Sequence, residues 1–382
     1  MKTRVVALDV IRGYALFGIL ICNMVLFAHP LEYINPYFSE HTAWYDELAT
    51  FIRFSFFGDK TFTIFSLLFG VGIGMQYNKF KESQRPFQRY HITRMSLLLV
   101  IGLLHAFFIW YGDILALYAV LGMLALLFTR LAPRQLYGLA LLFFLWPTVQ
   151  TIMMRMGMLS LSLPHPALLP LQELEALNTA QGFEGHWQYN TSQLWGTLQY
   201  YLTGNMYTSM SMILLGIGLA KARHHETIDE DIAFYRKLFS VSILVVIIWT
   251  IYFISLFDIS LMQNNVHFYG YWVIFNLSNL GQTFLVVSLI VLILHRGGWI
   301  KKLITPLRYM GRLSLTNYLL HSVFGLIIFK VVGYFGQSSP GIDLLLTLAI
   351  TAIQILLSRQ WIKRYGIGPI ERLWRWATSQ LT

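Results

Sequence analysis

A histidine and a carboxylate lie eight residues apart in a stretch that is otherwise almost entirely apolar. His105 can take a proton from a nucleophile near neutral pH, and Asp113 can orient its ring, so we predict these two as a catalytic pair. Eight residues of straight helix would separate them by about 12 Å, so a direct contact requires the chain to fold back near Gly112. The alternatives are an interhelical hydrogen bond for His105 and a helix N-cap for Asp113.

A charged pair, Asp9 and Arg12, stands at the start of the first apolar segment. Residues three apart share a helix face and can form an ion pair. A guanidinium group binds a phosphate or a carboxylate through two hydrogen bonds, so Arg12 suits a ligand that carries one of these groups. Asn23 lies eleven residues beyond Arg12 in nearly the same direction, so a polar stripe could continue along this helix. The alternative is an ion pair that satisfies itself and sets the depth of the helix.

A polar face is predicted in the ninth apolar segment, where Ser314, Asn317, Tyr318 and His321 recur at i, i+3, i+4 and i+7. Polar groups that face lipid are costly, so this face should meet a cavity or other helices. We predict that these residues line a cavity and that Asn279, in the preceding segment, completes it. The alternative is that they hold helices together through hydrogen bonds.

The elements that must position these residues follow from composition. Of the 382 residues, 56% are apolar and 12% are charged, whereas ordinary soluble domains are about 25% charged. A helix needs about 20 predominantly apolar residues to cross a bilayer. The sequence therefore predicts an all-α polytopic membrane helix bundle of about ten spans: 14–28, 61–77, 93–111, 113–129, 135–153, 204–220, 238–257, 271–295, 311–335 and 342–358. Within the second of these, Ser66, Gly70 and Gly74 predict close helix packing.

The distribution of Lys and Arg orients these spans. With both termini in the cytoplasm, almost all of the 28 cationic residues fall in cytoplasmic loops, as the positive-inside rule expects. The exceptions are Arg12, Arg53, Lys60, Arg155 and Lys330. The formal net charge of +10 is then a topogenic signal rather than an indication of nucleic-acid binding.

The domain organisation is predicted as a single integral membrane domain over residues 1–382. Residues 31–60 and 156–203 form long extracytoplasmic segments, and residues 359–382 form a cytoplasmic interfacial tail. The two outer segments could cover an outward-facing cavity, or their aromatic residues could pack at the membrane surface. The single cysteine, Cys22, excludes an internal disulfide and a cysteine-based metal site, and no metal site is predicted.

Four motifs together resemble the YeiB-like family of bacterial inner-membrane proteins, long catalogued as a domain of unknown function. They are Leu8–Leu20, Gly102–Leu115, Gly311–Leu320 and Gly368–Arg375. Ala106 departs slightly from the family's pattern, where a glycine is expected after the histidine. The family is grouped with the transmembrane acyltransferases through the Asp-x-x-Arg-Gly opening of the first span.

The resemblance implies an acyltransferase of the bacterial inner membrane. It would move an acyl group from a cytoplasmic acyl-CoA-like donor to an extracytoplasmic or lipid-linked acceptor. Arg12 would lie near the donor and His105 would be the base, with His29 in reserve because the relatives' key histidine lies nearer the first span. This function requires a continuous polar tunnel between Arg12 and His105, and a packed core between them would argue against it. Acyl-CoA would be a co-substrate with no permanently bound cofactor, and membrane lipids would be partners.

Two other functions use the same residues. A transporter or lipid flippase would use the polar faces as a pathway and would contain an open route and unwound membrane helices. An assembly or regulatory module would contain no cavity of ligand size and would tolerate His105→Ala.

Overall fold

The computed structural model describes residues 6–159, 169–179, 182–224, 231–255 and 265–382. Over these residues the chain is helical and contains no strand. Eight helical segments are long and apolar enough to cross a membrane. They are α1 (Val6–Ala28), α3 to α4 (Trp44–Glu82), α5 (Phe87–Phe108), α7 (Pro133–Arg155), most of α11 (Ile232–Ser255) and of α12 (Asn265–Arg296), α15 with the π-helical turn η7 (Ser314–Val331) and α16 (Pro340–Tyr365).

Two shorter apolar segments complete the predicted set. They are α6 with its last turn η3 (Leu115–Phe128) and α10 (Met206–Lys221). Each of the ten predicted spans coincides with one of these ten segments, so the all-α polytopic architecture is confirmed and the protein is a membrane protein. The remaining elements are short: η1 (Leu31–Tyr33), α2 (Ile34–Glu40), α8 (Leu171–Thr179), α9 (Phe183–Tyr200), η4 (Tyr201–Asn205), α13 (Gly298–Ile304), α14 (Leu307–Arg312) and α17 (Pro369–Leu381).

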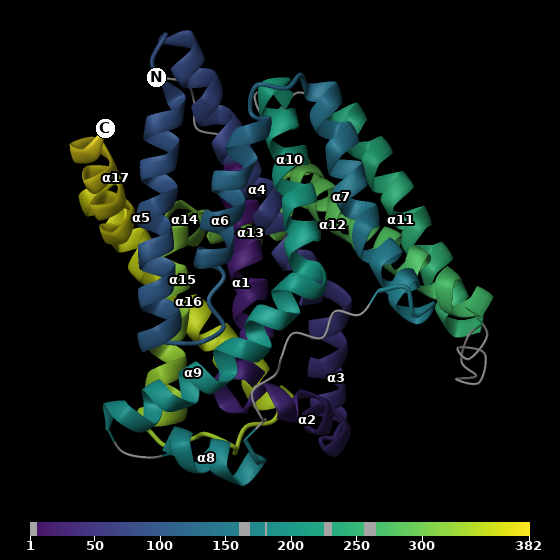
Figure 1. Ribbon diagram of the computed structural model, residues 1–382, viewed down its shortest axis with the longest axis vertical. Helices are drawn as coiled ribbons and strands as arrows, with labels where there is room; N and C mark the ends of the chain where they lie inside the picture. The colour runs from purple at the N-terminus through teal and green to yellow at the C-terminus, as the bar shows by residue number, and fades with distance from the viewer. Residues whose placement is uncertain (1–5, 160–168, 180–181, 225–230, 256–264) are drawn as a thin grey trace.

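The two ends of the bundle differ in what they carry. Figure 1 shows both termini at its upper end, and α2, α8 and α9 at its lower end. The predicted outer segments therefore lie together at one end, opposite the termini. The first of them is largely helical: α3 (Trp44–Ile52) runs on into the π-helical turn η2 (Arg53–Phe57). The backbone then leaves helical geometry at Phe57 and Gly58, where φ is +31° at Gly58, before α4 (Gly58–Glu82).

Glycines bring the central helices into close contact. A Cβ atom on Gly70 of α4 would lie 2.1 Å from the carbonyl oxygen of Ile213 in α10, and one on Gly216 would lie 2.2 Å from that of Leu67. Any larger side chain at either position would force the two helices apart. Gly74 meets Ala220 in the same way, so the packing ridge predicted from Ser66, Gly70 and Gly74 is confirmed.

The C-terminal helix α17 packs against α5, as Figure 1 shows. The Trp374 indole donates to the carbonyl oxygen of Arg94 at 2.9 Å, and the Arg94 guanidinium lies over the same ring. The Glu371 carboxylate accepts from the backbone N–H groups of Leu315 and Thr316, which begin α15. The tail helix therefore caps and braces the helix that carries the predicted polar face.

Candidate active site

A sharp reversal of the chain after α5 brings His105 and Asp113 together. The backbone N–H groups of Ile109 and Trp110 both donate to the carbonyl oxygen of His105, at 2.9 and 2.8 Å, which ends the helix. The chain then turns back at Gly112, where a Cβ atom would lie 2.3 Å from the Trp110 ring. Because only glycine leaves room for that indole, the fold-back predicted at Gly112 has a local cause in the sequence.

The His105–Asp113 contact is direct and buried. His105 Nδ1 lies 2.9 Å from Asp113 Oδ1, and both side chains are 1% exposed. The second carboxylate oxygen, Oδ2, accepts from the backbone N–H of Ala116 at 2.7 Å in the first turn of α6. Asp113 therefore contacts the histidine and also accepts a hydrogen bond at the start of the next helix, so the predicted contact and the capping role are compatible, and the catalytic role stays a prediction.

A third side chain, Ser322 of α15, completes a linear arrangement. Its Oγ lies 2.8 Å from His105 Nε2 and is buried as deeply as the histidine. A carboxylate can only accept, so Nδ1 donates to Asp113, Nε2 accepts, and the Ser322 hydroxyl donates. This is the order of contacts found in Ser-His-Asp catalytic sites, where the histidine removes the hydroxyl proton.

Two tyrosines hold the turn in place around this arrangement. Tyr318 Oη accepts from the backbone N–H of Ile114 at 3.1 Å, and its ring lies 5.6 Å from the His105 ring. Tyr201 Oη donates to the carbonyl oxygen of Asp113 at 2.8 Å. Both tyrosines bond to backbone atoms, so they fix the geometry without competing for the His105 or Asp113 side chains.

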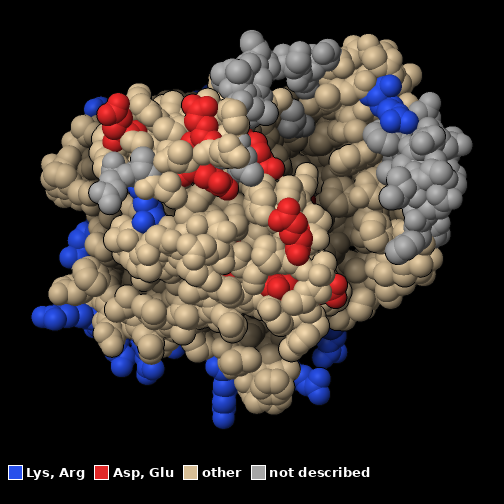
Figure 2. Space-filling model, turned by 90° about the horizontal axis from the view of Figure 1, so that it is seen from below, with Lys and Arg blue, Asp and Glu red and all other residues tan. Residues whose placement is uncertain are grey.

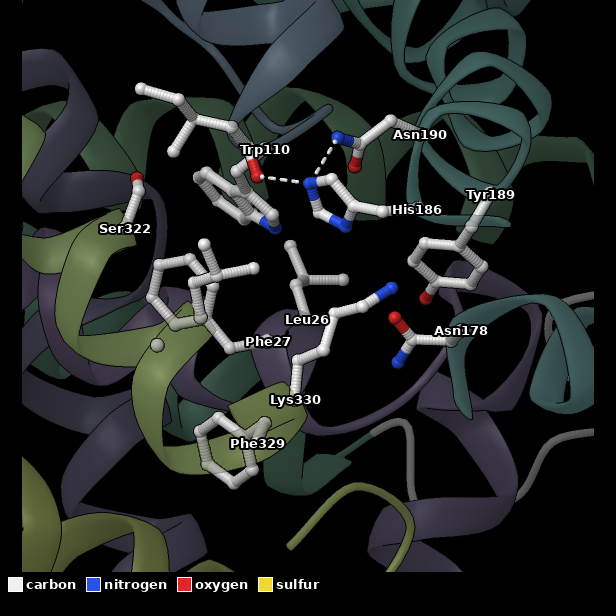
Figure 3. Close-up of a pocket in the computed structure, with 13 residues that line it drawn as sticks. Leu26, Phe27, Trp110, Asn178, His186, Tyr189, Asn190, Ser322, Phe329 and Lys330 are labelled. Carbon is white, nitrogen blue, oxygen red and sulfur yellow. Dashed lines mark hydrogen bonds between the residues drawn. The ribbon is translucent and has the colours of Figure 1, made fainter. Parts of the chain in front are cut away.

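A small cavity adjoins Ser322 at the end of the bundle that carries α8 and α9. Its volume is about 30 Å³, which is room for about two water molecules. Figure 3 shows Ser322 at one side and the Lys330 amine extending across it toward Asn178 and Tyr189. Trp110 from the turn and His186 from α9 also line it.

Of the two outer segments that could cover an outward-facing cavity, only one lines this cavity. Residues 156–203 contribute Asn178 from α8 and His186, Tyr189 and Asn190 from α9. Residues 31–60 line a different cavity, through Tyr37, Phe38, Ala49 and Arg53. The two segments are nevertheless linked, because Gln193 of α9 accepts from the backbone N–H of Leu31 at 2.9 Å.

Burial sets the charge state of His186, which lies outside the membrane-spanning helices. Its ring Nε2 is 3.2 Å from the carbonyl oxygen of Ile109. Desolvation, followed by the nearby Lys330 charge, lowers the pKa of His186 below its ordinary value. The neutral ring leaves Nδ1 buried and without a hydrogen-bond partner among the described residues.

Two residues predicted to line the cavity instead join helices. Asn317 Nδ2 donates to the carbonyl oxygens of Met310 and Leu313, and to Ser358 Oγ at 3.0 Å in α16. His321 Nε2 lies 3.0 Å from Gln354 Oε1, also in α16. Neither Asn317 nor His321 lines the two cavities described here. Each has a hydrogen bond to α16, which agrees with the alternative role of joining helices, whereas His321 Nδ1 has no partner among the described residues.

The other predicted cavity residues lie away from the two cavities described above. Ser314 and Asn23 are half-buried, and Asn279 is half-buried on α12, where its carbonyl oxygen accepts from Thr283. Tyr318 lies against His105 but does not line either cavity. Of the predicted polar face, Tyr318 alone is beside the catalytic pair.

The Asp9–Arg12 pair forms at the opposite end of α1 from Ser322. Arg12 Nη1 lies 3.5 Å from Asp9 Oδ1, and α14 packs closely on this end through Gly13 and Gly311. The helix face between Arg12 and Asn23 carries Leu16 and Ile19, both buried in the main hydrophobic core. The predicted polar stripe from Arg12 to Asn23 is therefore interrupted by packed apolar side chains.

His29, the reserve base, has a different environment from His105. Its ring packs beside Tyr33, Tyr37 and Phe335, and its Nε2 is buried without a hydrogen-bond partner among the described residues. Burial lowers the pKa of His29 to about 4. No carboxylate or hydroxyl pair engages this ring as Asp113 and Ser322 engage His105.

Ser322 was missed by reasoning from the sequence, although a signal was present. Ser314, Tyr318 and Ser322 are spaced by four, so the serine shares a face with Tyr318. The adjacent His321 drew attention to the neighbouring face instead. Lys330 was likewise visible as one of the few cations on the outer side.

Comparisons with known proteins agree with the motifs. Residues 219–380 match the family model described as "Protein of unknown function (DUF418)". Over 98% of its length the chain is 27% identical to "Uncharacterized protein YxaH" of Bacillus subtilis (strain 168), covering 94% of that protein. Over 98% of its length it is 25% identical to "Uncharacterized protein YeiB" of Escherichia coli (strain K12), covering 96% of that protein. None of these descriptions states an activity, and the similarity over nearly the whole chain agrees with the resemblance that the motifs indicate.

Proposed function

We propose that the protein is a membrane acyltransferase in which Ser322, His105 and Asp113 carry out the chemistry. One observation carries this proposal: the buried chain of contacts from Asp113 to His105 at 2.9 Å and from His105 to Ser322 at 2.8 Å. Ionisable groups inside a membrane are costly and usually serve a function. Here they are arranged to remove a proton from a hydroxyl group beside a cavity.

The reaction proceeds in two steps, acylation of Ser322 and transfer of the acyl group to the acceptor. Ser322 Oγ attacks the carbonyl carbon of an activated acyl donor while His105 Nε2 takes the hydroxyl proton. The bond to the leaving thiolate or alkoxide breaks, and His105 returns the proton to that group, which leaves an acyl ester on Ser322. In the second step His105 takes a proton from the acceptor's hydroxyl or amine, which attacks this ester. His105 then returns the proton to Ser322 Oγ.

Asp113 acts on the histidine in both steps. Its carboxylate holds the tautomer in which Nε2 is free to accept, and it stabilises the imidazolium that forms when the proton is transferred. The surroundings of this pair are apolar and buried, which strengthens the electrostatic interaction compared with water. Tyr201 and Tyr318 hold the turn that carries Asp113 in place through hydrogen bonds to its backbone, and Tyr318 joins it to α15.

The donor and acceptor follow from where the site lies. The cavity beside Ser322 is at the end of the bundle that carries the predicted extracytoplasmic segments, which supports an extracytoplasmic or lipid-linked acceptor. Acyl-CoA is the donor that the family resemblance implies, and the bacterial inner membrane is the location. A role for Asp9 and Arg12 in holding the CoA phosphates would require the packed core around Leu16 and Ile19 to open during the reaction.

The test is covalent labelling of Ser322 by an alkyl fluorophosphonate, which needs no knowledge of the natural substrate. Attack by an activated serine oxygen on phosphorus expels fluoride, and His105 takes the proton. We expect a single adduct on the peptide that contains Ser322, found by mass spectrometry of the purified protein. Ser322→Ala and His105→Gln should both abolish it.

Ser211→Ala is the matched control, because Ser211 is equally buried and donates to the carbonyl oxygen of Ala140 in α7. It should label as the parent does, and thermal stability should confirm that every variant is folded. Labelling of Ser322 that is unaffected by His105→Gln, or absent from the folded parent, would reject the proposed chemistry and leave these contacts as interhelical hydrogen bonds.

A further inference from the structure

The amine nitrogen of Lys330 is inaccessible although the side chain as a whole is half-buried, and no described residue pairs with it. Lys330 lies in the π-helical turn η7 that follows α15, and it lines the same cavity as Ser322. A lysine near the end of a membrane helix ordinarily extends its flexible chain to the headgroup layer. Figure 3 shows this one directed into the cavity instead.

Other polar atoms around the cavity are also unsatisfied. The Trp110 indole Nε1, a donor, and His186 Nδ1 are buried without hydrogen-bond partners in the described structure. Buried polar groups in folded proteins are nearly always hydrogen-bonded, so several exceptions around one cavity indicate a missing partner. Two water molecules could satisfy the neutral groups, but water cannot neutralise the lysine charge.

We propose that this cavity binds the anionic group, a phosphate or a carboxylate, of the molecule that exchanges its acyl group with Ser322. Lys330 supplies the counter-charge and the Trp110 N–H a second donor, and an anion accepts from both. The assignment rests on the proposed function only in naming the bound molecule as a substrate. The cavity of about 30 Å³ takes the terminal atoms of the anionic group, and the rest of the molecule lies outside it.

The charge of the surrounding surface favours a lipid as the source of this anion. Figure 2 looks onto the end of the bundle that carries α8 and α9 and shows acidic side chains gathered there. A face of this sign lowers the local concentration of free anions, whereas a lipid phosphate reaches the site through the bilayer. The exposed acidic residues of the two outer segments are Glu32, Glu40, Glu47, Asp59, Glu173, Glu175 and Glu184.

The experiment measures the thermal stability of the purified protein with three probes: phosphatidylglycerol, phosphatidylcholine and inorganic phosphate. Lys330→Met keeps the length of the side chain and removes the charge, and Lys330→Arg keeps the charge. Lys302→Met removes a charge from an exposed lysine in α13 and is the matched control. We expect phosphatidylglycerol to raise the midpoint of the parent, Lys330→Arg and Lys302→Met by several degrees more than phosphatidylcholine does.

The Lys330→Met variant gives two further readouts. Without added anion it should unfold at a higher temperature than the parent, because an uncompensated buried charge is removed. It should also lose the preference for phosphatidylglycerol. If inorganic phosphate alone stabilises the parent but not Lys330→Met, the result supports the anion site and shows that the bound anion comes from a water-soluble molecule.

A Lys330→Met variant that is less stable than the parent without anion, or that responds to each probe as the parent does, would overturn the anion site. Neither outcome depends on acyl transfer. Fluorophosphonate labelling of Ser322 tests that chemistry separately, so the failure of one proposal is distinguishable from the failure of the other.

Discussion

His105 and His321 are both buried histidines in membrane helices, and both meet polar side chains from a second element. His105 lies between a carboxylate and a hydroxyl group, with Asp113 at Nδ1 and Ser322 at Nε2. His321 bonds through Nε2 to the neutral amide of Gln354, and its Nδ1 has no partner among the described residues. Only the contacts of His105 lead to a residue that lines the cavity, because Ser322 does and Gln354 does not.

This difference shows how two buried histidines of the same bundle can differ in the chemistry that their contacts allow. Burial and residue type are shared, so neither distinguishes them. What distinguishes them is the pair of groups on the ring: an acid on one nitrogen stabilises the protonated ring, and a hydroxyl on the other supplies the proton. An amide does neither, and it serves instead as a hydrogen-bond partner between α15 and α16.

The largest expected effect is the difference in the rate of acyl transfer between His105→Gln and His321→Gln. Glutamine retains hydrogen-bonding capacity but cannot take a proton, so His105→Gln should slow transfer or fluorophosphonate labelling by about 10⁴-fold. His321→Gln should label at the parent rate and instead lose about 1–3 kcal/mol of stability through the disturbed bond to Gln354. Rates and thermal midpoints measured on the same preparations provide the comparison. Equal rates in both variants would remove His105 from the chemistry.

A smaller effect on labelling is expected at Asp113, which both contacts His105 and caps α6, and two substitutions can separate these roles. Asp113→Asn keeps an oxygen to accept from the Ala116 N–H and so preserves the cap of α6, but it removes the negative charge beside His105. Labelling should fall about 10³-fold with stability close to that of the parent. Asp113→Ala should lose the same rate and, in addition, about 1 kcal/mol of stability with the cap. A fully active asparagine variant would show that capping is the only role of Asp113.

Much of the fold could be predicted from the sequence because a bilayer imposes a length and a composition on each span. The ten apolar segments and the close approach at Gly70 and Gly74 follow from these constraints. The helical stretch formed by α3 and η2 ahead of α4 was not predictable in the same way. Its first turns carry Asp46, Glu47 and Arg53, whose charges indicate a loop when burial by neighbouring elements is unknown.

The candidate site was predictable only where its contacts are local in the chain. His105 and Asp113 are eight residues apart, and Gly112 marks the turn between them. Ser322 is 217 residues from His105, so its contact depends on how α15 packs against the end of α5. The contacts of Asn317 and His321 were not predictable for the same reason, because a polar helix face does not show whether α16 or a cavity covers it.

The smallest predicted effect concerns His29, which should control acid stability rather than chemistry. Burial lowers the pKa of His29 to about 4 from its ordinary 6.5, so the folded protein favours the neutral ring. The unfolded chain therefore takes up this proton near pH 6.5 and the folded protein only near pH 4, so stability is highest above about pH 6.5 and falls as the pH drops toward 4. The loss of stability by pH 5 is about 2 kcal/mol. His29→Phe keeps an aromatic ring beside Tyr33 and Tyr37 and removes the titration, so its thermal midpoint should fall less between pH 7 and pH 5 than that of the parent. His295→Phe, at an exposed position in α12, is the control and should follow the parent. If His29→Phe instead loses labelling of Ser322 at pH 7 while remaining folded, the contrast between this histidine and His105 fails, and His29 takes part in the reaction.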